Sequence, residues 1–492
     1  MFEISPACRL SKWVRKNECL VAARPLGSIF FYHAQAIARS AVRCLQKCEK
    51  NSCTPTGTRS MEPPHKHPRR NDEPTMSPSL PDLSTLPELV LIHILSFMDP
   101  KEAVQTCILS KRWRNLWTYV TSLNFNKSAF KRTAHFVRFV TNMLFFRGAI
   151  KLDTFRLYWF TRKRTGDTYS MKNRQICASN ISSWIFSALS CKPLTISLVL
   201  HGFANLKLPH ALFTCASLEQ LELGLYDCNN EEVIGTKYVN LPSLKKLELA
   251  GLTVNDPVMQ MILSGCPLLE ELCLSVCSLK LSEMRSDLLR SLTIRQCQGS
   301  GVVEIFMPSL ISLHLKNPGR LGTILSLKNT PSLVKVFVFS NYFQGYSFSA
   351  AEFEFFTCLT SATDLKLYGS GVMALLEQTG LNCPVFDNLK RLTFGRWQIN
   401  NNLDLLCRLL QHTPNLEKLT IVHTAHRSPR NPKKKGATGQ IPFRCEQLRA
   451  IEIKYSDPSG VHELVDILLR NTSHRERVLS ISPASKCEIS NL

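Results

Sequence analysis

The segment from Pro242 to Leu274 reads PSLKKLELAGLTVNDPVMQMILSGCPLLEELCL and contains one apolar pattern twice. The two copies of this L-x-x-L-x-L pattern are Leu244-Leu247-Leu249 and Leu269-Leu272-Leu274. The last two leucines of each copy are separated by a single residue, so in a β-strand they point to the same face. Between the copies, Asp256-Pro257 is typical of a helix start, and the helical pattern ends near Gly265. The segment therefore predicts a repeated unit of one strand and one helix.

The pattern recurs, with conservative replacements, from about residue 150 to the end of the chain. Its other copies are Leu152-Phe155-Leu157, Leu218-Leu221-Leu223, Leu289-Leu292-Ile294, Leu310-Leu313-Leu315, Leu333-Val336-Val338, Ala362-Leu365-Leu367, Leu389-Leu392-Phe394, Leu416-Leu419-Ile421 and Leu448-Ile451-Ile453, with a looser copy at Leu194-Ile196-Leu198-Leu200. From Leu218 onward the copies start roughly 20 to 32 residues apart, which brackets the period of leucine-rich repeats. One unit cannot bury its apolar row alone, so neighbouring units must stack. We therefore expect an irregular leucine-rich-repeat solenoid, a horseshoe of mixed α/β class.

Two cysteines occupy equivalent positions in this repeat. Cys277 and Cys297 each follow the last apolar strand residue of a copy by three positions. The resemblance to leucine-rich repeats implies Asn or Cys at that position, a small group buried at the turn, and buried cysteine behaves as a small hydrophobe. We interpret both cysteines as structural rather than reactive.

Residues 82–117 read DLSTLPELVLIHILSFMDPKEAVQTCILSKRWRNLW and predict three short helices. Pro87 suits the first helical position, and Asp99-Pro100 is an N-cap followed by a proline. Ser110 would cap a third helix, Lys111 to Thr118. In the first helix one apolar stripe consists of Leu91, Ile94, Leu95 and Met98, whereas Leu89 and Ile92 point elsewhere. A soluble helix normally needs only one apolar stripe, so the surplus predicts a second partner.

This segment resembles an F-box. The matching positions are Leu86-Pro87, Ile94-Leu95, and Leu109-Ser110-Lys111-Arg112-Trp113-Arg114 with Leu116-Trp117. The resemblance implies that the segment docks on a Skp-type adaptor, which links it to a cullin ubiquitin ligase. The adaptor-binding residues that it implies are Leu86, Pro87, Ile92, Leu95, Cys107, Leu109, Trp113 and Trp117. The alternative is a helical hairpin that only caps the repeats downstream.

Irregular repeats that follow an F-box resemble plant F-box/leucine-rich-repeat proteins, and the resemblance covers residues 79 to about 480. Residues 441–482 resemble the FBD-type region of that family. They contain the strand pattern Leu448 to Ile453, a helix with Val461, Leu464, Val465, Leu468 and Leu469 on one face, and a final strand Arg477 to Ile481. We expect an F-box at 79–120, the solenoid at 121–440 and an FBD-like cap at 441–482. Residues 1–78 would be an extension and linker, either a disordered tail, a transit peptide, or a segment ahead of a true start at Met61 or Met76.

Composition restricts the function further. The net charge of +22 favours acidic partners, nucleic acid or anionic membranes, but no aromatic residues are interleaved with the basic ones as base stacking requires. We therefore do not expect nucleic-acid binding. No apolar stretch is long enough to span a membrane. The basic run Arg427 to Lys435 is a solvated loop or a nuclear import signal.

The 19 cysteines lie mostly singly within apolar segments, which favours a reduced compartment, the nucleus and/or the cytoplasm. Cys44, Cys48 and Cys53 lack the paired spacing of a zinc site. No phosphate-binding loop, zinc-protease motif or nucleophile elbow occurs in the sequence. We expect no catalytic residue, no cofactor and no metal.

These observations predict the substrate-recognition subunit of an SCF-type (Skp–cullin–F-box) ubiquitin ligase. Its F-box would hold the adaptor and its repeats would hold a target protein for ubiquitination and degradation. The alternative is a ubiquitin-independent repeat scaffold that binds acidic protein or nucleic-acid partners.

Overall fold

The computed structural model describes residues 86–160, 171–203, 206–228, 238–299, 301–316, 325–340, 350–379, 384–397, 406–423, 446–456, 461–470 and 478–483. The chain divides into two compact units, Met1–Leu200 and His201–Leu492. The predictions for the N-terminal extension, for Cys44, Cys48 and Cys53 within it, and for the basic run Arg427 to Lys435 lie outside the described residues.

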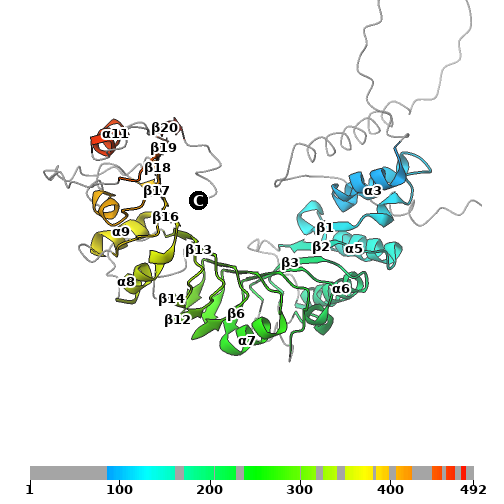
Figure 1. Cartoon of the computed structure of the whole chain (residues 1–492). Coiled ribbons are helices and arrows are strands. Elements are labelled where there is room, and N and C mark those ends of the chain that lie inside the picture. Colours follow the sequence, from blue (N-terminus) through cyan, green and yellow to red (C-terminus); the bar gives the residue numbers. More distant parts are fainter. Residues whose placement is uncertain are drawn as a thin grey trace, which may run out of the picture. The chain divides into compact units, whose positions relative to one another are not determined.

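The first unit begins with short helices and continues with alternating strands and helices (Figure 1). The short helices are α3 (Glu88–Ser96), α4 (Pro100–Gln105), η2 (Thr106–Ile108) and η3 (Leu116–Tyr119). They are followed by β1 (Ser122–Asn126), η4 (Lys127–Ala129), α5 (Thr133–Arg147), β2 (Thr154–Trp159), α6 (Met171–Ser190) and β3 (Thr195–His201). Strand β2 pairs in parallel with β1 on one side and with β3 on the other.

A buried arginine joins the short helices to these strands. Arg147, at the end of α5, is only 3% exposed. Its guanidinium donates hydrogen bonds to the carbonyl oxygens of Val120, Ile150 (3.2 Å) and Lys151 (2.5 Å). Burial lowers the pKa of this guanidinium. The Arg147 guanidinium therefore satisfies three carbonyl groups that are not paired within a regular strand. One of them, that of Val120, lies where the short helices end.

The second unit contains a long row of parallel strands that pair in sequence order. These strands are β4 (Gln220–Tyr226), β5 (Lys246–Ala250), β7 (Glu271–Ser275), β10 (Ser291–Arg295), β13 (Ser312–Lys316), β15 (Lys335–Phe339), β16 (Asp364–Tyr368), β17 (Arg391–Trp397), β18 (Lys418–His423), β19 (Ala450–Tyr455) and β20 (Val478–Pro483). The predicted strand of every L-x-x-L-x-L copy is confirmed.

Helices and short strands occupy the connections between these strands. The helices are η5 (His210–Thr214), α7 (Asp256–Gly265), α8 (Ala350–Thr357), η7 (Cys358–Ser361), α9 (Ser370–Thr379) and α11 (Val461–Arg470), and residues 406–411 are also helical. Two small parallel sheets consist of β6 (Thr253–Asn255), β8 (Ser278–Lys280) and β11 (Gln298–Gly299), and of β9 (Glu283–Arg285), β12 (Val303–Phe306) and β14 (Leu325–Asn329). Helices α7, α8, α9 and α11 lie along one side of the strand row (Figure 1).

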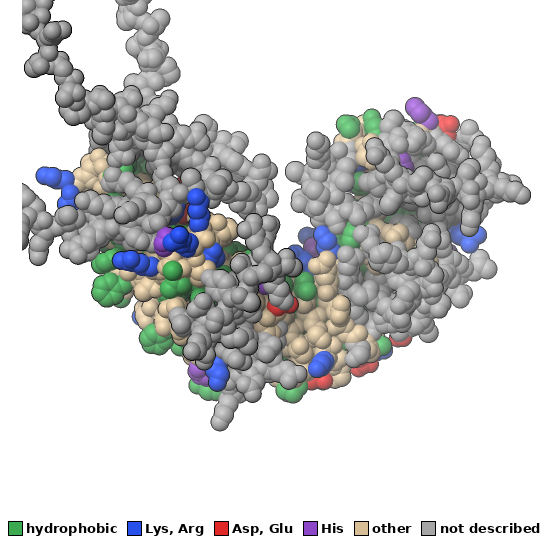
Figure 2. All heavy atoms as spheres, turned by 180° about the vertical axis from the view of Figure 1, so that it is seen from behind, with side chains coloured by type: hydrophobic (Ala, Val, Ile, Leu, Met, Phe, Trp, Pro, Cys, Tyr) green, Lys and Arg blue, Asp and Glu red, His purple; other side chains and the backbone are tan. Residues whose placement is uncertain are grey.

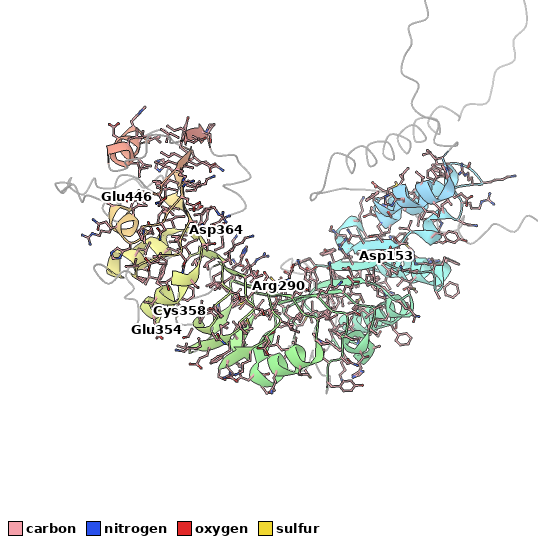
Figure 3. The ribbon with its side chains drawn as sticks, viewed as in Figure 1. Asp153, Arg290, Glu354, Cys358, Asp364 and Glu446 are labelled. Carbon is pink, nitrogen blue, oxygen red and sulfur yellow. The ribbon has the colours of Figure 1, made fainter. Side chains whose placement is uncertain are left out.

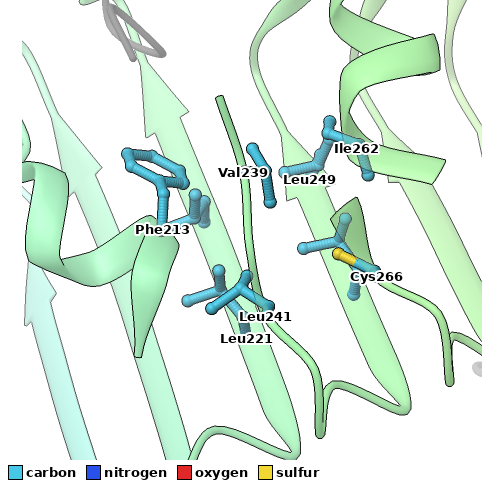
Figure 4. A pocket seen from close by; sticks show the side chains of 9 residues that line it. Phe213, Leu221, Val239, Leu241, Leu249, Ile262 and Cys266 are labelled. Carbon is cyan, nitrogen blue, oxygen red and sulfur yellow. The ribbon is translucent and has the colours of Figure 1, made fainter. Parts of the chain in front are cut away.

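The long row keeps its register from strand to strand. Leu221 pairs with Leu247, Leu247 with Leu272, and so on through Leu292, Leu313, Val336, Leu365, Leu392, Leu419 and Ile451. Each of these side chains is at most 3% exposed, so together they form one continuous apolar column. Between β4, β5 and α7 lies a cavity of about 10 Å³, lined by apolar side chains including Phe213, Leu241 and Ile262 (Figure 4). Such a space would hold about one water molecule and is too small for a ligand.

A tight corner follows many of these strands, at a residue with positive φ. These residues are Gly202, Asp227, Gly251, Val276, Gln296 and Gly369. The N–H of Gly251 donates to Ser275 O at 3.0 Å, and the N–H of Val276 donates to Arg295 O at 2.7 Å. The corner therefore adds one more hydrogen bond between neighbouring strands. Val276 is unusual because a β-branched residue rarely adopts its φ of 53°.

The two predicted structural cysteines lie directly after such corners. Cys277 and Cys297 are 2% and 1% exposed. The thiol of Cys277 donates to Leu249 O and that of Cys297 donates to Leu274 O, each at 3.4 Å. Each thiol thus satisfies a carbonyl group of the preceding strand, which confirms that these cysteines are buried at the turn.

The helix start in the quoted segment differs by one position from the prediction. The N-cap of α7 is Asn255, whose side-chain oxygen accepts a hydrogen bond from the Val258 N–H at 3.1 Å. Asp256 is instead the first helical residue, and its carboxylate accepts hydrogen bonds from the N–H and hydroxyl of Ser282 at 2.8 and 2.9 Å. The carboxylate therefore connects the helix to the following repeat.

The C-terminal end of the row is less completely buried than its interior. In α11, Val461, Leu464 and Leu468 are buried as expected, but Leu469 is 44% exposed because it lies at the edge of the apolar stripe. Leu479 and Ile481 of β20 continue the apolar column, yet they are 37% and 47% exposed. The last apolar layer is therefore partly open in the described part of the chain.

We expect Val276→Gly to raise the free energy of unfolding by about 0.5–1 kcal/mol, because glycine adopts positive φ without a steric cost. Val276 is 47% exposed, so little burial is lost. Val302→Gly is the matched control, because Val302 is 43% exposed and has no positive φ. It should lower the free energy by a similar amount. Denaturant unfolding of both variants measures the difference, and equal destabilisation would show that the corner at Val276 is unstrained.

Candidate functional site

The helical segment 86–120 is closed by hydrogen bonds at both ends. The Pro87 carbonyl accepts the N–H groups of Val90 (3.0 Å) and Leu91 (3.2 Å), so Pro87 is the N-cap of α3 rather than its first residue. The Arg112 guanidinium donates to the Leu86 carbonyl oxygen and thereby joins the two ends of the segment. The Asp99 carboxylate caps α4 by accepting the Lys101 N–H at 2.9 Å, as predicted.

The predicted third helix, Lys111 to Thr118, is not formed as such. Residues 111–115 are a turn, and only Leu116–Tyr119 are helical, with 3₁₀ geometry. The Ser110 carbonyl accepts the Trp113 N–H at 3.2 Å, a three-residue spacing that is typical of turns and 3₁₀ helices. The apolar face survives this change, since Trp113, Leu116 and Trp117 are 7%, 4% and 0% exposed.

The eight predicted adaptor-binding residues fall into two groups. Leu95, Cys107, Trp113 and Trp117 are buried within the first unit. Leu86, Ile92 and Leu109 are half-buried, and Pro87 is exposed. Only the second group presents substantial surface to a partner in this conformation. The first group supports the segment from inside.

Helix α3 exposes apolar side chains that the prediction did not include. Leu89 is 80% exposed, Val90 42% and Phe97 37%. With His93, whose ring packs edge-on against Phe97 at 4.7 Å, these residues lie within about 100° of one another around the helix. We call Leu89, Val90, His93 and Phe97 the outer face of α3. The apolar residues outside the buried stripe are the sequence signal for this face, and of its members Leu89 is identified from the sequence.

Hydrophobic side chains also reach the surface elsewhere, as the space-filling view shows (Figure 2). In the first unit, Phe145 on α5 and Phe186 on α6 are 77% and 61% exposed. The outer face of α3 differs from these because it combines several apolar positions on one short helix. No helix of the described residues is long and apolar enough to cross a membrane.

Asp99 is electrostatically unusual. Burial raises its pKa to about 6, against a smaller lowering by the hydrogen bond from the Lys101 N–H. Because this pKa lies above that of an unfolded aspartate, the folded state binds the proton more tightly. The stabilising contribution of that proton is complete below pH 4 and is lost as the pH rises through 6.

We expect Asp99→Asn to stabilise the protein at pH 7.5 by about 1–2 kcal/mol, because the amide oxygen keeps the cap without a buried charge. The advantage over the native chain should vanish near pH 4. Asp99→Ala, which loses the cap, should destabilise by about 1 kcal/mol at pH 4. Thermal unfolding followed by tryptophan fluorescence at several pH values measures these differences. An Asn variant whose advantage does not change with pH would contradict the raised pKa.

Comparison with known proteins places both parts of the chain. Residues 83–124 match the F-box domain model, and residues 194–344 match the model of the leucine-rich repeats of "FBD-associated F-box protein At5g56370". Three relatives come from Arabidopsis thaliana. "F-box/LRR-repeat protein At5g02910" is 30% identical, over 70% of this chain and 72% of the relative. "Putative FBD-associated F-box protein At5g56440" is 31% identical, over 68% and 74%. "Putative F-box/LRR-repeat protein At3g18150" is 29% identical, over 73% and 76%.

The fold and these matches define a protein with an F-box followed by a leucine-rich-repeat region. The chain belongs to the plant F-box/leucine-rich-repeat family, whose members include FBD-associated F-box proteins.

Proposed function

We propose that this protein is the substrate-recognition subunit of an SCF-type ubiquitin ligase. The observation that supports this best is the outer face of α3, which exposes Leu89, Val90 and Phe97 within the matched F-box. Exposed apolar residues grouped on one face mark a protein interaction site more often than scattered ones do. Proteins with an F-box generally use it to bind a Skp-type adaptor.

The adaptor site would combine the outer face of α3 with the accessible members of the predicted set, Pro87, Ile92 and Leu109. A partner covering this surface would remove water from side chains that the fold leaves exposed. Leu95 and Trp117 would contribute indirectly, because they hold α3 against the 3₁₀ helix from inside.

The repeats would form a leucine-rich-repeat solenoid that holds the target. The parallel pairing of the strands in sequence order from β4 to β19 supports this architecture, because each repeat then contacts chiefly its neighbours. Residues 79–120 would be the F-box, 121–440 the repeats and 441–482 the FBD-like cap. We further propose that the protein works in the nucleus and/or the cytoplasm.

The mechanism would be positional rather than covalent. Tethering a target beside a charged ubiquitin-conjugating enzyme raises the effective concentration of the reacting groups. Burial raises the pKa of the Cys266 thiol to about 12 and also raises that of Cys228, so these two thiols would be poor nucleophiles.

Co-precipitation of the full chain with a Skp-type adaptor tests the proposal. Leu89→Asp/Val90→Asp should reduce adaptor recovery at least tenfold, because two charges would enter an apolar contact. Phe145→Asp is the control, since Phe145 is exposed on α5 and belongs neither to the outer face of α3 nor to the predicted adaptor-binding residues. Both variants should retain the unfolding midpoint of the native chain.

Adaptor recovery that is unchanged in the α3 variant, or absent with the folded native chain, would contradict the ligase function. Binding of acidic or nucleic-acid partners without an adaptor, with a steep salt dependence, would favour the scaffold instead.

A further inference from the structure

Cationic and aromatic side chains gather on one part of the strand row, across β10, β13, β15 and β16. We call this the basic-aromatic surface, and it consists of Arg295, His314, Lys316, Lys335, Phe337, Lys366 and Tyr368, the last of which is itself buried. These residues alternate along their strands with the buried residues of the apolar column, so they lie on the opposite face of the sheet. In Figure 3, Asp364 of β16 marks this face, whereas Glu354 and Cys358 lie on the helix side.

The aromatic members form a continuous row across three strands. The rings of His314 and Phe337 lie 5.6 Å apart at 35°, and those of Phe337 and Tyr368 lie 5.3 Å apart at 32°. The Tyr368 ring extends over Gly395 of β17, where a side chain would collide with it. The row is therefore ordered before any partner binds, which lowers the entropy cost of binding.

The cations at this surface are less neutralised than those on other strands. Lys246 pairs with Glu271 at 3.0 Å, and Lys418 pairs with Glu452 at 2.8 Å. In the described part of the chain, no carboxylate lies within ion-pair distance of Lys335 or Lys366.

The carboxylate nearest to them in the strand register is already engaged. Asp364, the register partner of Lys335, pairs with Arg391 at 3.2 Å. Lys335 and Lys366 are exposed, whereas Phe337 is half-buried. The surface therefore has an excess of positive charge around a partly accessible aromatic ring.

The positive charge is limited in extent. The equivalent positions on β4 and β5 are Glu222 and Glu248, and burial together with the Glu222 charge raises the pKa of Glu248. The four strands of the basic-aromatic surface span about 14 Å at 4.8 Å per strand. This length fits four or five residues of an extended chain.

We propose that the basic-aromatic surface binds a short acidic segment of a partner protein, in extended form, with an apolar or aromatic side chain against Phe337. The inference rests on the proposed function in one respect: the segment would belong to the target of the ligase. A protein segment fits better than nucleic acid, because a long polyanion would meet Glu222 and Glu248. The aromatic rings also pack against each other, which leaves less of each face for a base.

Fluorescence anisotropy with the full chain tests the site. The probe is a fluorescein-labelled pentapeptide of four glutamates around a central tyrosine, at about 50 mM salt to limit screening. Lys335→Gln/Lys366→Gln should weaken binding about tenfold, and Phe337→Leu about fivefold. Lys280→Gln/Arg138→Gln removes the same charge at exposed positions outside the surface and should leave the affinity within twofold.

Equal weakening by the control pair would show that net charge alone attracts the peptide and would overturn the site. So would tighter binding of a five-nucleotide oligothymidylate that the Lys335/Lys366 pair weakens equally, because the surface would then be a nucleic-acid site. Adaptor co-precipitation of the same variants separates the two proposals. If the native chain recovers no adaptor but its peptide binding is weakened by these variants as expected, only the ligase function is contradicted. If the adaptor is recovered with every variant but peptide binding is not weakened, only this site is contradicted.

Discussion

The structure of the second unit depends on the parallel pairing that keeps the apolar residues of successive strands in matching positions. Because Leu247, Leu272 and Leu292 occupy the same position in consecutive strands, one apolar column runs through the unit without a break. The backbone bonds at the strand entrances follow the same rule: the N–H groups of Lys245 and Lys246 both donate to Glu219 O. A slip of one residue would turn every column residue to the opposite face. The helices, corners and exposed strand face are all positioned by this register.

The strands could be predicted from sequence because their signal is local. Two apolar residues separated by a single residue, and preceded by a third apolar residue, mark the buried face of each strand. The corners could not be predicted as well. A glycine such as Gly251 can be predicted to adopt positive φ from the sequence. Val276 adopts the same conformation because the hydrogen bond to Arg295 and the burial of Cys277 require it, and neither is visible in the sequence. The prediction of a third helix in the F-box was wrong for a similar reason. Arg112 bonds back to Leu86, and the chain takes a turn that local propensity does not indicate.

The candidate sites were less predictable than the fold because both arise from tertiary context. In the F-box, the most distinctive apolar residues, Trp113 and Trp117, are buried in the interior. The exposed apolar residues include the less conspicuous Leu89 and Val90. A small unit uses its largest side chains to fold, so motif residues and contact residues need not coincide. On the repeats, His314, Phe337 and Tyr368 come from separate strands. Only the register brings their rings together.

The partly open layer at β20 has an evolutionary consequence. Leu479 and Ile481 of β20 occupy the same positions as the apolar column residues of the interior strands, and they are partly exposed. The side of β20 that faces away from β19 therefore resembles the side that any interior strand offers to its neighbour. Duplication or deletion of one whole repeat by unequal recombination would therefore join compatible edges and disturb only the immediate neighbours. Such events would lengthen, shorten or shift the exposed strand face while leaving α3 and its outer face untouched. The architecture therefore allows the number of repeats to change without altering the surface of α3.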